Sequence, residues 1–192
     1  FKQKTAYEIG VRLVGSEMCI RDRPQISQLL LKKTMKTKTG IGQDSHAFEE
    51  PPGKPLILAG IKLEHPTGLK GNSDADVVLH SITNAISSIT GRNILGSVAD
   101  QLCQEGVTDS SNYLKLALDD LGDWKISHIA IAIECLKPKI SSQLESMKKS
   151  IAKLCHTNTS DVGITATTGE GLTAVGKGEG IQAITIITVN KS

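Results

Sequence analysis

The chain has 192 residues, enough for one domain with a real core, and only five of them are aromatic, so aliphatic side chains must fill that core. No apolar run approaches the ~20 residues that a membrane helix needs. The four cysteines form no CxxC pair, which favours a reducing, cytoplasmic setting. Residues 1–39 carry nine basic and three acidic residues, so the remainder is mildly acidic despite the net charge of +2, which argues against nucleic acid as a partner.

The first 38 residues differ from the rest of the chain. Residues 1–23 resemble a translated sequencing adapter, and residues 24–38 read as a basic leader. A transit peptide fits poorly, because the segment contains acids and few serines. We therefore expect residues 1–38 to lie outside the fold and residues 39–192 to form a single domain.

The domain begins with a predicted strand, TGIGQDSHAF, over residues 39–48. Residues two apart in a strand project from the same face, so Asp44 and His46 are expected to point into one space. A Pro/Gly-rich turn follows. Residues 56–65 then predict a second strand that is broken or bent near Gly60.

A loop leads into a predicted helix over residues 74–90, with Ser73 as its cap and Asp76 in the reciprocal position. Helical spacing sorts its residues into two faces. The apolar stripe consists of Val78, Ile82, Ala85, Ile86 and Ile89. The opposite, polar side consists of Asp76, His80, Asn84 and Ser87.

The remaining periodic segments alternate between helix and strand without a strict βαβ repeat. Helices are predicted over residues 109–122 and 141–156, and strands over residues 126–135, 161–168 and 180–190. This order predicts an α+β fold, a single domain with a mixed β-sheet covered on one side by helices.

Two histidines and one carboxylate form a candidate metal site. His80 taken alone fits an exposed histidine on a wet helix face. Asp44 and His46 change that interpretation, because two imidazoles and a carboxylate suit Zn²⁺ and leave a fourth position open for a substrate oxygen.

Two further segments are candidates for phosphate binding. The glycine-rich residues 169–180, with Lys177, are either a flexible turn or a loop whose backbone N–H groups face phosphate oxygens. They lack the GKS or GKT of a P-loop. The KPK segment, residues 137–139, is either an ordinary polar turn or a phosphate site at a helix N-terminus. Glu170 follows two threonines at a predicted strand end.

Four motifs in this order are together much more specific than any one alone: DSH, NSDADVVLH, KPK and TATTGEGLTAVGKGEG. They resemble the 2-C-methyl-D-erythritol 2,4-cyclodiphosphate synthase family of non-mevalonate isoprenoid biosynthesis. The resemblance runs from about Thr39 to the C-terminus. It implies a homotrimer whose sites lie between neighbouring subunits.

The resemblance also implies roles for individual residues. Zn²⁺ would be held by Asp44, His46 and His80, and Mg²⁺ or Mn²⁺ by Glu170 between substrate phosphates. The catalytic residues would be Thr168, Asn72 and Lys139. The substrate-binding residues would be Asp44, Ser45, His46, Asn72, Ser73, Gly96, Cys135, Leu136, Lys137, Pro138, Lys139, Ile140, Ser141, Thr167, Thr168, Glu170 and Lys177.

The implied reaction is an intramolecular cyclisation. In 4-diphosphocytidyl-2-C-methyl-D-erythritol 2-phosphate, the 2-phosphate attacks the β-phosphate, closes a ring and expels CMP. A phosphate monoester has a second pKa of about 6, so this nucleophile needs no strong base near neutrality. The obstacles are repulsion among three phosphates and folding of the substrate upon itself, which two cations, Lys139 and a shaped pocket address.

The chain departs from the family pattern where the methylerythritol phosphate is expected. Asn72 replaces histidine, Asn84 and Ile94 replace aspartates, and Lys177 replaces arginine. SVADQLCQ stands in place of an FPD-type segment. Two alternatives stay open. One is a zinc-dependent phosphoester hydrolase, and the other is a non-catalytic trimer that binds isoprenoid diphosphates through Lys177 and Glu179.

Overall fold

The computed structural model describes residues 35–191, so the adapter-like segment and most of the expected leader lie outside the described residues. The first strand begins at Lys36, ahead of the expected domain boundary at residue 39. The ammonium group of Lys38 lies 4.9 Å from the ring centroid of Trp124, a cation–π contact between the start of this strand and a distant loop.

Six strands, four α-helices and three short 3₁₀ helices make up the described part of the chain. In order they are β1 (Lys36–Ala47), β2 (Leu56–Leu58), β3 (Ile61–Leu63), α1 (Val77–Thr90), α2 (Ser97–Gln104), α3 (Ser110–Asp119), β4 (Lys125–Cys135), η1 (Ser141–Gln143), α4 (Leu144–Leu154), η2 (Thr159–Asp161), β5 (Val162–Thr167), η3 (Gly169–Gly171) and β6 (Gly180–Lys191).

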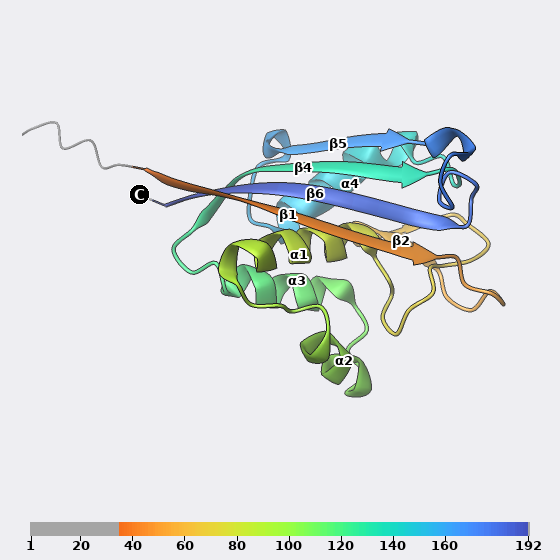
Figure 1. The fold of residues 1–192 in the computed structure, drawn as a ribbon, viewed down its shortest axis with the longest axis horizontal. Helices are drawn as coiled ribbons and strands as arrows, with labels where there is room; N and C mark the ends of the chain where they lie inside the picture. Colours follow the sequence, from red (N-terminus) through yellow and green to blue (C-terminus); the bar gives the residue numbers. More distant parts are fainter. Residues whose placement is uncertain (1–34, 192) are drawn as a thin grey trace, which may run out of the picture. The chain divides into compact units, whose positions relative to one another are not determined.

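The main sheet is mixed, with the strand order β1-β6-β4-β5. β6 pairs antiparallel with β1 and with β4, whereas β4 pairs parallel with β5. β1, β4 and β5 therefore run in the same direction, and their arrowheads meet at one edge of the sheet (Figure 1). This edge brings together the carboxyl ends of the three strands that precede the predicted site motifs.

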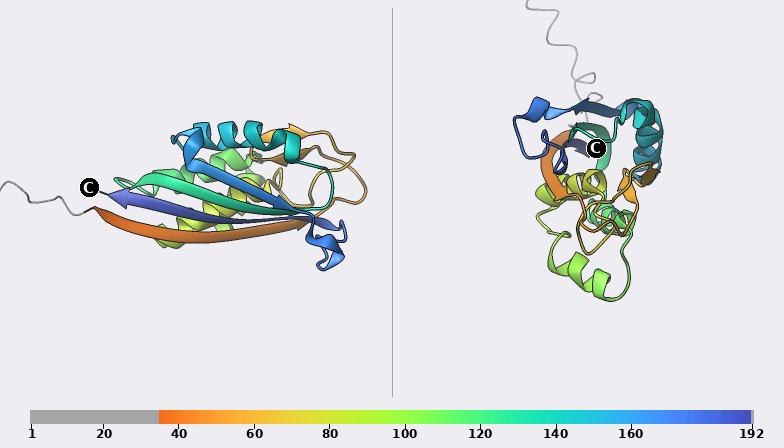
Figure 2. Two further views of the ribbon diagram at one scale, coloured as in Figure 1. Left: turned by 90° about the horizontal axis from the view of Figure 1, so that it is seen from above. Right: turned by 90° about the vertical axis from the view of Figure 1, so that its right-hand side faces the viewer.

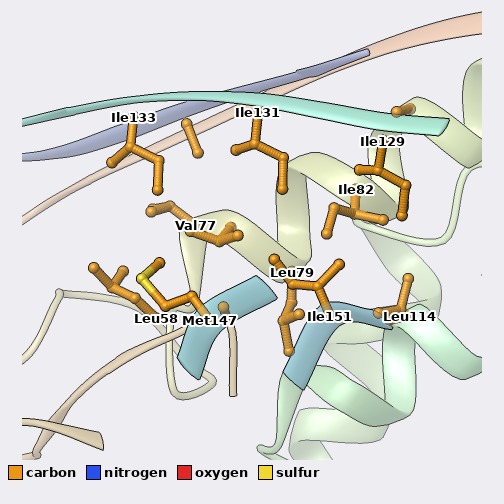
Figure 3. Close-up of a cluster of buried hydrophobic side chains, with 14 of the residues drawn as sticks. Leu58, Val77, Leu79, Ile82, Leu114, Ile129, Ile131, Ile133, Met147 and Ile151 are labelled. Atoms are coloured by element: carbon orange, nitrogen blue, oxygen red, sulfur yellow. The ribbon is translucent and has the colours of Figure 1, made fainter. Parts of the chain in front are cut away.

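The helices lie on one face of this sheet (Figure 2), which confirms the predicted α+β arrangement. Ile129, Ile131 and Ile133 alternate along β4 and are all buried on the helix side. They point toward side chains of α1 and α4, among them Val77 and Met147 (Figure 3). Burial of each such side chain stabilises the fold by about 1.5–3 kcal/mol.

Two glycines of β1 let the backbone of α1 approach the sheet closely. A Cβ on Gly40 would lie 2.2 Å from the carbonyl oxygen of Ala85, and one on Gly42 would lie 2.2 Å from that of Ser81. Real Cβ atoms essentially never come so near a backbone oxygen. The buried hydroxyls of Ser81 and Thr185, 2.7 Å apart, add a hydrogen bond between α1 and β6.

The predicted cap of α1 is wrong. Asp76, not Ser73, is the N-cap, and its carboxylate accepts hydrogen bonds from the backbone N–H groups of Val78 and Leu79. The same carboxylate accepts from the backbone N–H groups that follow β2, those of residues 59 and 60. Asp76 is therefore buried where four donors converge, while the hydroxyl of Ser73 accepts only from the N–H of residue 75.

The break expected near Gly60 is a tight turn. Ala59 and Gly60 have positive φ values of 56° and 71°, and the two halves pair as the antiparallel strands β2 and β3 in a sheet of their own.

Helix α2 was not predicted. It lies farther from the main sheet than α1 and α3 (Figure 1) and buries Ala99.

The face of the sheet opposite the helices carries an apolar patch. Ile41, Ile184 and Ile186 are exposed there, with fractional exposures of 63%, 37% and 45%. Ile41 pairs with Ile186 in the β1–β6 register, so the patch crosses neighbouring strands. Among residues 35–191, no helix is long and apolar enough to cross a membrane.

Candidate metal centre and active site

The structure brings Asp44, His46 and His80 together. Oδ2 of Asp44 lies 3.2 Å from Nε2 of His46 and 2.8 Å from Nδ1 of His80. One potential ligand atom from each residue falls within a group whose members are all within 4.8 Å of one another. The predicted set of three ligands is therefore assembled in space, although His80 is 36 positions from Asp44 along the chain.

Strand and helix geometry explain this arrangement. Asp44 and His46 follow Gly40 and Gly42 on the helix side of β1, because alternate residues of a strand share a face. The close approach of α1 at these glycines carries His80 to the end of the strand. His80 is 7% exposed, because the carboxylate of Asp44 and the start of α3 cover it, so the alternative of an exposed histidine on a wet helix face does not hold.

The electrostatics of the cluster suit a cation. Burial opposes ionisation of Asp44, but hydrogen bonds to His46 and His80 outweigh that cost and hold the pKa of its carboxyl well below the ordinary value. The hydrogen bond to Asp44 raises the pKa of His46. An ionised carboxylate between two imidazoles is a donor set that fits Zn²⁺ and leaves a coordination position open.

The cluster lies at one wall of a pocket of about 410 Å³. The pocket is lined by Asp44, His46, Gly71, Asn72, Ser73, His80, Asn84, Asn93, Leu95, Gly96, Ala99, Asp100, Cys103 and Tyr113. Asn72, Ser73 and Gly96 thus line the same pocket as the three predicted metal ligands. The unpredicted α2 supplies Asp100 and Cys103.

A lysine that the sequence analysis missed holds the loop over this pocket. Nζ of Lys54 donates to the carbonyl oxygens of Gly71, at 2.8 Å, and Ser73, at 2.6 Å. These bonds fix the backbone on both sides of Asn72. No local pattern marks Lys54 for this role, because its partners are carbonyl groups that any residue carries.

Three of the positions where the sequence departs from the family pattern have different surroundings in the structure. Ile94 is fully buried in the core and offers nothing to a polar ligand. The side-chain amide of Asn84 donates to the carbonyl oxygen of Gln43 at 3.0 Å. Asn72 is exposed at the mouth of the pocket. Asn93 and Asp100 line the same pocket as Asn72 and Asn84.

The KPK segment follows the carboxyl end of β4. Sγ of Cys135 donates to the carbonyl oxygens of Lys137 and Pro138, at 3.2 and 3.4 Å, and so shapes the turn. Burial raises the pKa of Cys135 to about 11, so this thiol is neutral at physiological pH. Lys137 and Lys139 are exposed, with both ammonium groups available to an anion.

The TTGE segment follows the carboxyl end of β5, beside KPK, because Glu134 of β4 pairs with Thr167 of β5. The hydroxyl of Thr167 accepts from the N–H of Gly169 at 3.3 Å. Glu170 is exposed and has a φ of 48°, an uncommon conformation for a residue with a side chain. Such backbone strain is concentrated at functional sites in proteins.

The remaining predicted residues lie outside the metal cluster. Ser45 is exposed on the sheet face opposite Asp44, because it occupies the alternate position of β1. Ile140 is buried, and Ser141 begins η1. The phosphate segments, with Lys139, Glu170 and Lys177, lie outside the metal pocket although they share the same sheet edge.

Comparison with known proteins identifies close relatives. The model of the YgbB family matches residues 37–190. The chain is 49% identical over 156 residues to a protein of Chlamydia trachomatis serovar L2b named 2-C-methyl-D-erythritol 2,4-cyclodiphosphate synthase, covering 79% of this chain and 87% of that one. A protein of Chlamydia felis with the same name is 50% identical over 155 residues, covering 79% and 88%. A solved structure described as 2C-methyl-D-erythritol-2,4-cyclodiphosphate synthase in a CDP-bound form is 26% identical, with a TM-score of 0.66 over 79% of this chain and 99% of that one.

Proposed function

The chain belongs to the YgbB family, and we propose that it catalyses the reaction for which its chlamydial relatives are named, the formation of 2-C-methyl-D-erythritol 2,4-cyclodiphosphate. It is a phosphorus–oxygen lyase of non-mevalonate isoprenoid biosynthesis. The observation that carries this function is that Asp44, His46 and His80 are assembled in one pocket. The pocket lies at the edge of the sheet where the strands that precede KPK and TTGE also end.

The substrate supplies its own nucleophile. An oxygen of the 2-phosphate forms a bond to the β-phosphorus of the cytidine diphosphate group, and the bond from that phosphorus to the oxygen of CMP breaks. CMP leaves, and an eight-membered ring closes that contains both phosphorus atoms, the oxygen between them, and O2, C2, C3, C4 and O4 of the methylerythritol. Because the monoester is largely a dianion above a pKa of about 6, the protein has to position and neutralise phosphates rather than remove a proton.

Asp44, His46 and His80 are the residues that would hold Zn²⁺. When bound, the ion supplies positive charge to a phosphate oxygen at its open position. Glu170 would hold Mg²⁺ or Mn²⁺ together with substrate phosphates. A single exposed carboxylate is a weak site for such ions, which normally take further ligands from the phosphates themselves.

The residues at the strand ends bind the nucleotide in this proposal. The stretch from Cys135 to Ser141 wraps the cytosine and its phosphates, and Lys139 places an exposed ammonium group beside them. Thr167 and Thr168 contact the diphosphate, with Thr168 stabilising the transition state. Lys177 adds a second positive charge from the glycine-rich loop. The exposure of Lys137, Lys139 and Lys177 supports these assignments.

The metal pocket receives the methylerythritol phosphate. Asn72 and Ser73 cover it from the loop that Lys54 holds, and Gly96 borders it from the start of α2. An amide at position 72 can donate and accept hydrogen bonds but carries no charge, so Asn72 orients the substrate without neutralising a phosphate.

We further propose a homotrimer in which neighbouring subunits complete each site. Two observations support it. The phosphate-binding segments lie outside the metal pocket of their own chain, and the uncovered face of the sheet exposes Ile41, Ile184 and Ile186. Contiguous exposed apolar surface of this kind marks interaction sites.

The test is to incubate the purified protein with the cytidine-diphospho substrate and follow CMP. The expected products are CMP and a ring whose mass equals that of the substrate minus CMP, because cyclisation adds no water. A zinc-dependent hydrolase would release a linear product that is heavier by one water. Metal-depleted protein is the control, and CMP release that is unaffected by metal depletion contradicts the proposal.

A further inference from the structure

The imidazole nitrogen of His80 that points away from the metal cluster also has a hydrogen-bond partner. Its Nε2 lies 2.8 Å from the hydroxyl oxygen of Ser110, the first residue of α3. That hydroxyl in turn contacts Oδ1 of Asp74. Ser110 is fully buried, so solvent does not compete for these bonds. A chain of contacts therefore runs from Asp74 through Ser110 to His80.

The number of protons available in this series of contacts determines which group donates each hydrogen bond. The carboxylate of Asp74 accepts from the backbone N–H of Ser110 at 3.1 Å and from that of Asp76 at 3.2 Å. An ionised carboxylate has no proton to donate, and a serine hydroxyl has only one. The hydroxyl of Ser110 must give that proton to Asp74, so it can only accept from His80.

The tautomer of the imidazole follows. In the metal-free protein a proton lies between Nδ1 of His80 and the carboxylate of Asp44. Zn²⁺ would take the place of that proton, and with Nε2 protonated the lone pair of the neutral ring then lies on Nδ1. That is the atom required for a metal ligand at this cluster. The two histidines thus present different nitrogens to the same place: Nδ1 from His80 and Nε2 from His46.

We infer that Ser110 and Asp74 are positioning residues that hold His80 in its Nε2–H tautomer, so that Nδ1 binds the metal. They touch neither substrate nor metal and act through the imidazole alone. Partners of this type orient a ligand and increase its basicity, and their loss typically lowers metal affinity about 10- to 100-fold. The inference rests on the proposed metal site.

A purely structural role for Ser110 is the competing explanation. Ser110 opens α3 directly after the N-cap Asp109, and its N–H bonds to Asp74, so the pair also ties α3 to the loop before α1. Loss of that role would lower the free energy of unfolding of the metal-free protein. It would not change which nitrogen of His80 binds metal, nor the zinc affinity of the folded fraction.

Two measurements separate these explanations. In the zinc-loaded wild-type protein, long-range ¹H–¹⁵N correlation spectra report which nitrogen of His80 carries a proton and which binds Zn²⁺. We expect the proton on Nε2 and the ion on Nδ1. Competition with a chromogenic chelator gives the zinc dissociation constant, which Ser110→Ala should raise about 10- to 100-fold. Ser110→Thr retains the hydroxyl and should recover most of the affinity.

Ser111→Ala is the matched control, because Ser111 is the next residue of α3 and its backbone N–H, which alanine retains, donates to Asp109. Its zinc affinity should equal that of the wild type. Zinc on Nε2 of His80, or wild-type zinc affinity in Ser110→Ala whatever its stability, overturns the inference alone. A wild-type protein that binds no zinc overturns the proposed metal site, and the inference with it.

Discussion

Gly42 of β1 and Ser81 of α1 meet backbone to backbone: a Cβ on Gly42 would lie 2.2 Å from the carbonyl oxygen of Ser81. This approach explains why His80, the residue before Ser81, reaches the carboxylate of Asp44, two residues after Gly42. The spacing between strand and helix is thus set by a missing side chain. The geometry of the metal centre depends on it directly.

Gly42→Ala should therefore disturb both stability and metal binding. Forcing a methyl group into this contact should lower the free energy of unfolding by about 1–3 kcal/mol, the usual cost of overpacking. It should also weaken zinc binding, because α1 must move away from β1. Denaturant unfolding of the metal-free protein and chelator competition measure the two effects.

Gly163→Ala is the control for this change. Gly163 also lies in a strand, but a Cβ there would meet its nearest atoms at 3.9 Å, an ordinary contact. Its effect on stability should stay within about 0.5 kcal/mol. Equal effects of the two substitutions would show that the close approach at Gly42 has no special importance.

His80→Ala should abolish zinc binding and CMP release while α1 stays folded, because alanine is the better helix former. Elemental analysis of the purified variant and its far-ultraviolet circular dichroism report metal and helix separately. His156→Asn is the control: His156 is an exposed histidine with a φ of 52°, a conformation that asparagine tolerates. Stoichiometric zinc in His80→Ala would disprove the three-ligand site.

Glu170→Gln should separate the two metals. We expect stoichiometric zinc in the resting protein but loss of most CMP release, partly restored by raising the concentration of Mg²⁺ or Mn²⁺, because the carboxylate mainly sets affinity for that ion. Asp44→Asn should lose zinc and respond little to Mg²⁺. The exposed Glu64→Gln is the control. Loss of zinc from Glu170→Gln, or normal turnover at low Mg²⁺, would contradict this division.

The stability of the metal-free protein should depend on pH through Asp44 and His46. Asp44, whose folded pKa is lowered, contributes stability above its ordinary value of 3.8 that is lost as pH falls through the folded value. His46, whose folded pKa is raised, contributes stability below its ordinary value of 6.5 that is lost as pH rises through the folded value. Their combined contribution is therefore complete only between these two ordinary values.

Denaturant unfolding of chelator-treated protein in a pH series measures this dependence. The difference in free energy of unfolding between wild type and Asp44→Asn should be largest inside that window and should shrink on both sides of it. A difference that is constant across the series would mean that the pair does not stabilise the metal-free fold.

Ile186→Asp should dissociate the proposed trimer, because it places a charge in the middle of the apolar face formed by Ile41, Ile184 and Ile186. Light scattering coupled to size exclusion reports the molar mass. Lys62→Asp, on the small β2–β3 sheet, is the control and should leave the mass unchanged. A trimeric Ile186→Asp protein would place the interface elsewhere.

Features that depend only on residues close together in the chain could be predicted from the sequence. Alternation in residues 39–48 predicted that Asp44 and His46 share a face, because the side-chain period of a strand is two and needs no knowledge of the partner strand. Spacing likewise predicted α1, α3, α4 and β4. The chemistry of two imidazoles and one carboxylate added His80 as a candidate ligand, and the resemblance of four ordered motifs assigned roles to it and to the segments at the strand ends.

Contacts between residues distant in the chain could be seen only in the folded protein. It selected Asp76 over Ser73 as the cap of α1, because only Asp76 meets the donors that follow β2. It placed Ser110 against His80, 30 positions away, and Lys54 beneath the pocket loop. These choices follow from how closely whole elements pack, as at Gly42 and Ser81, and a local pattern contains no information about which distant backbone will occupy the space that a glycine leaves free.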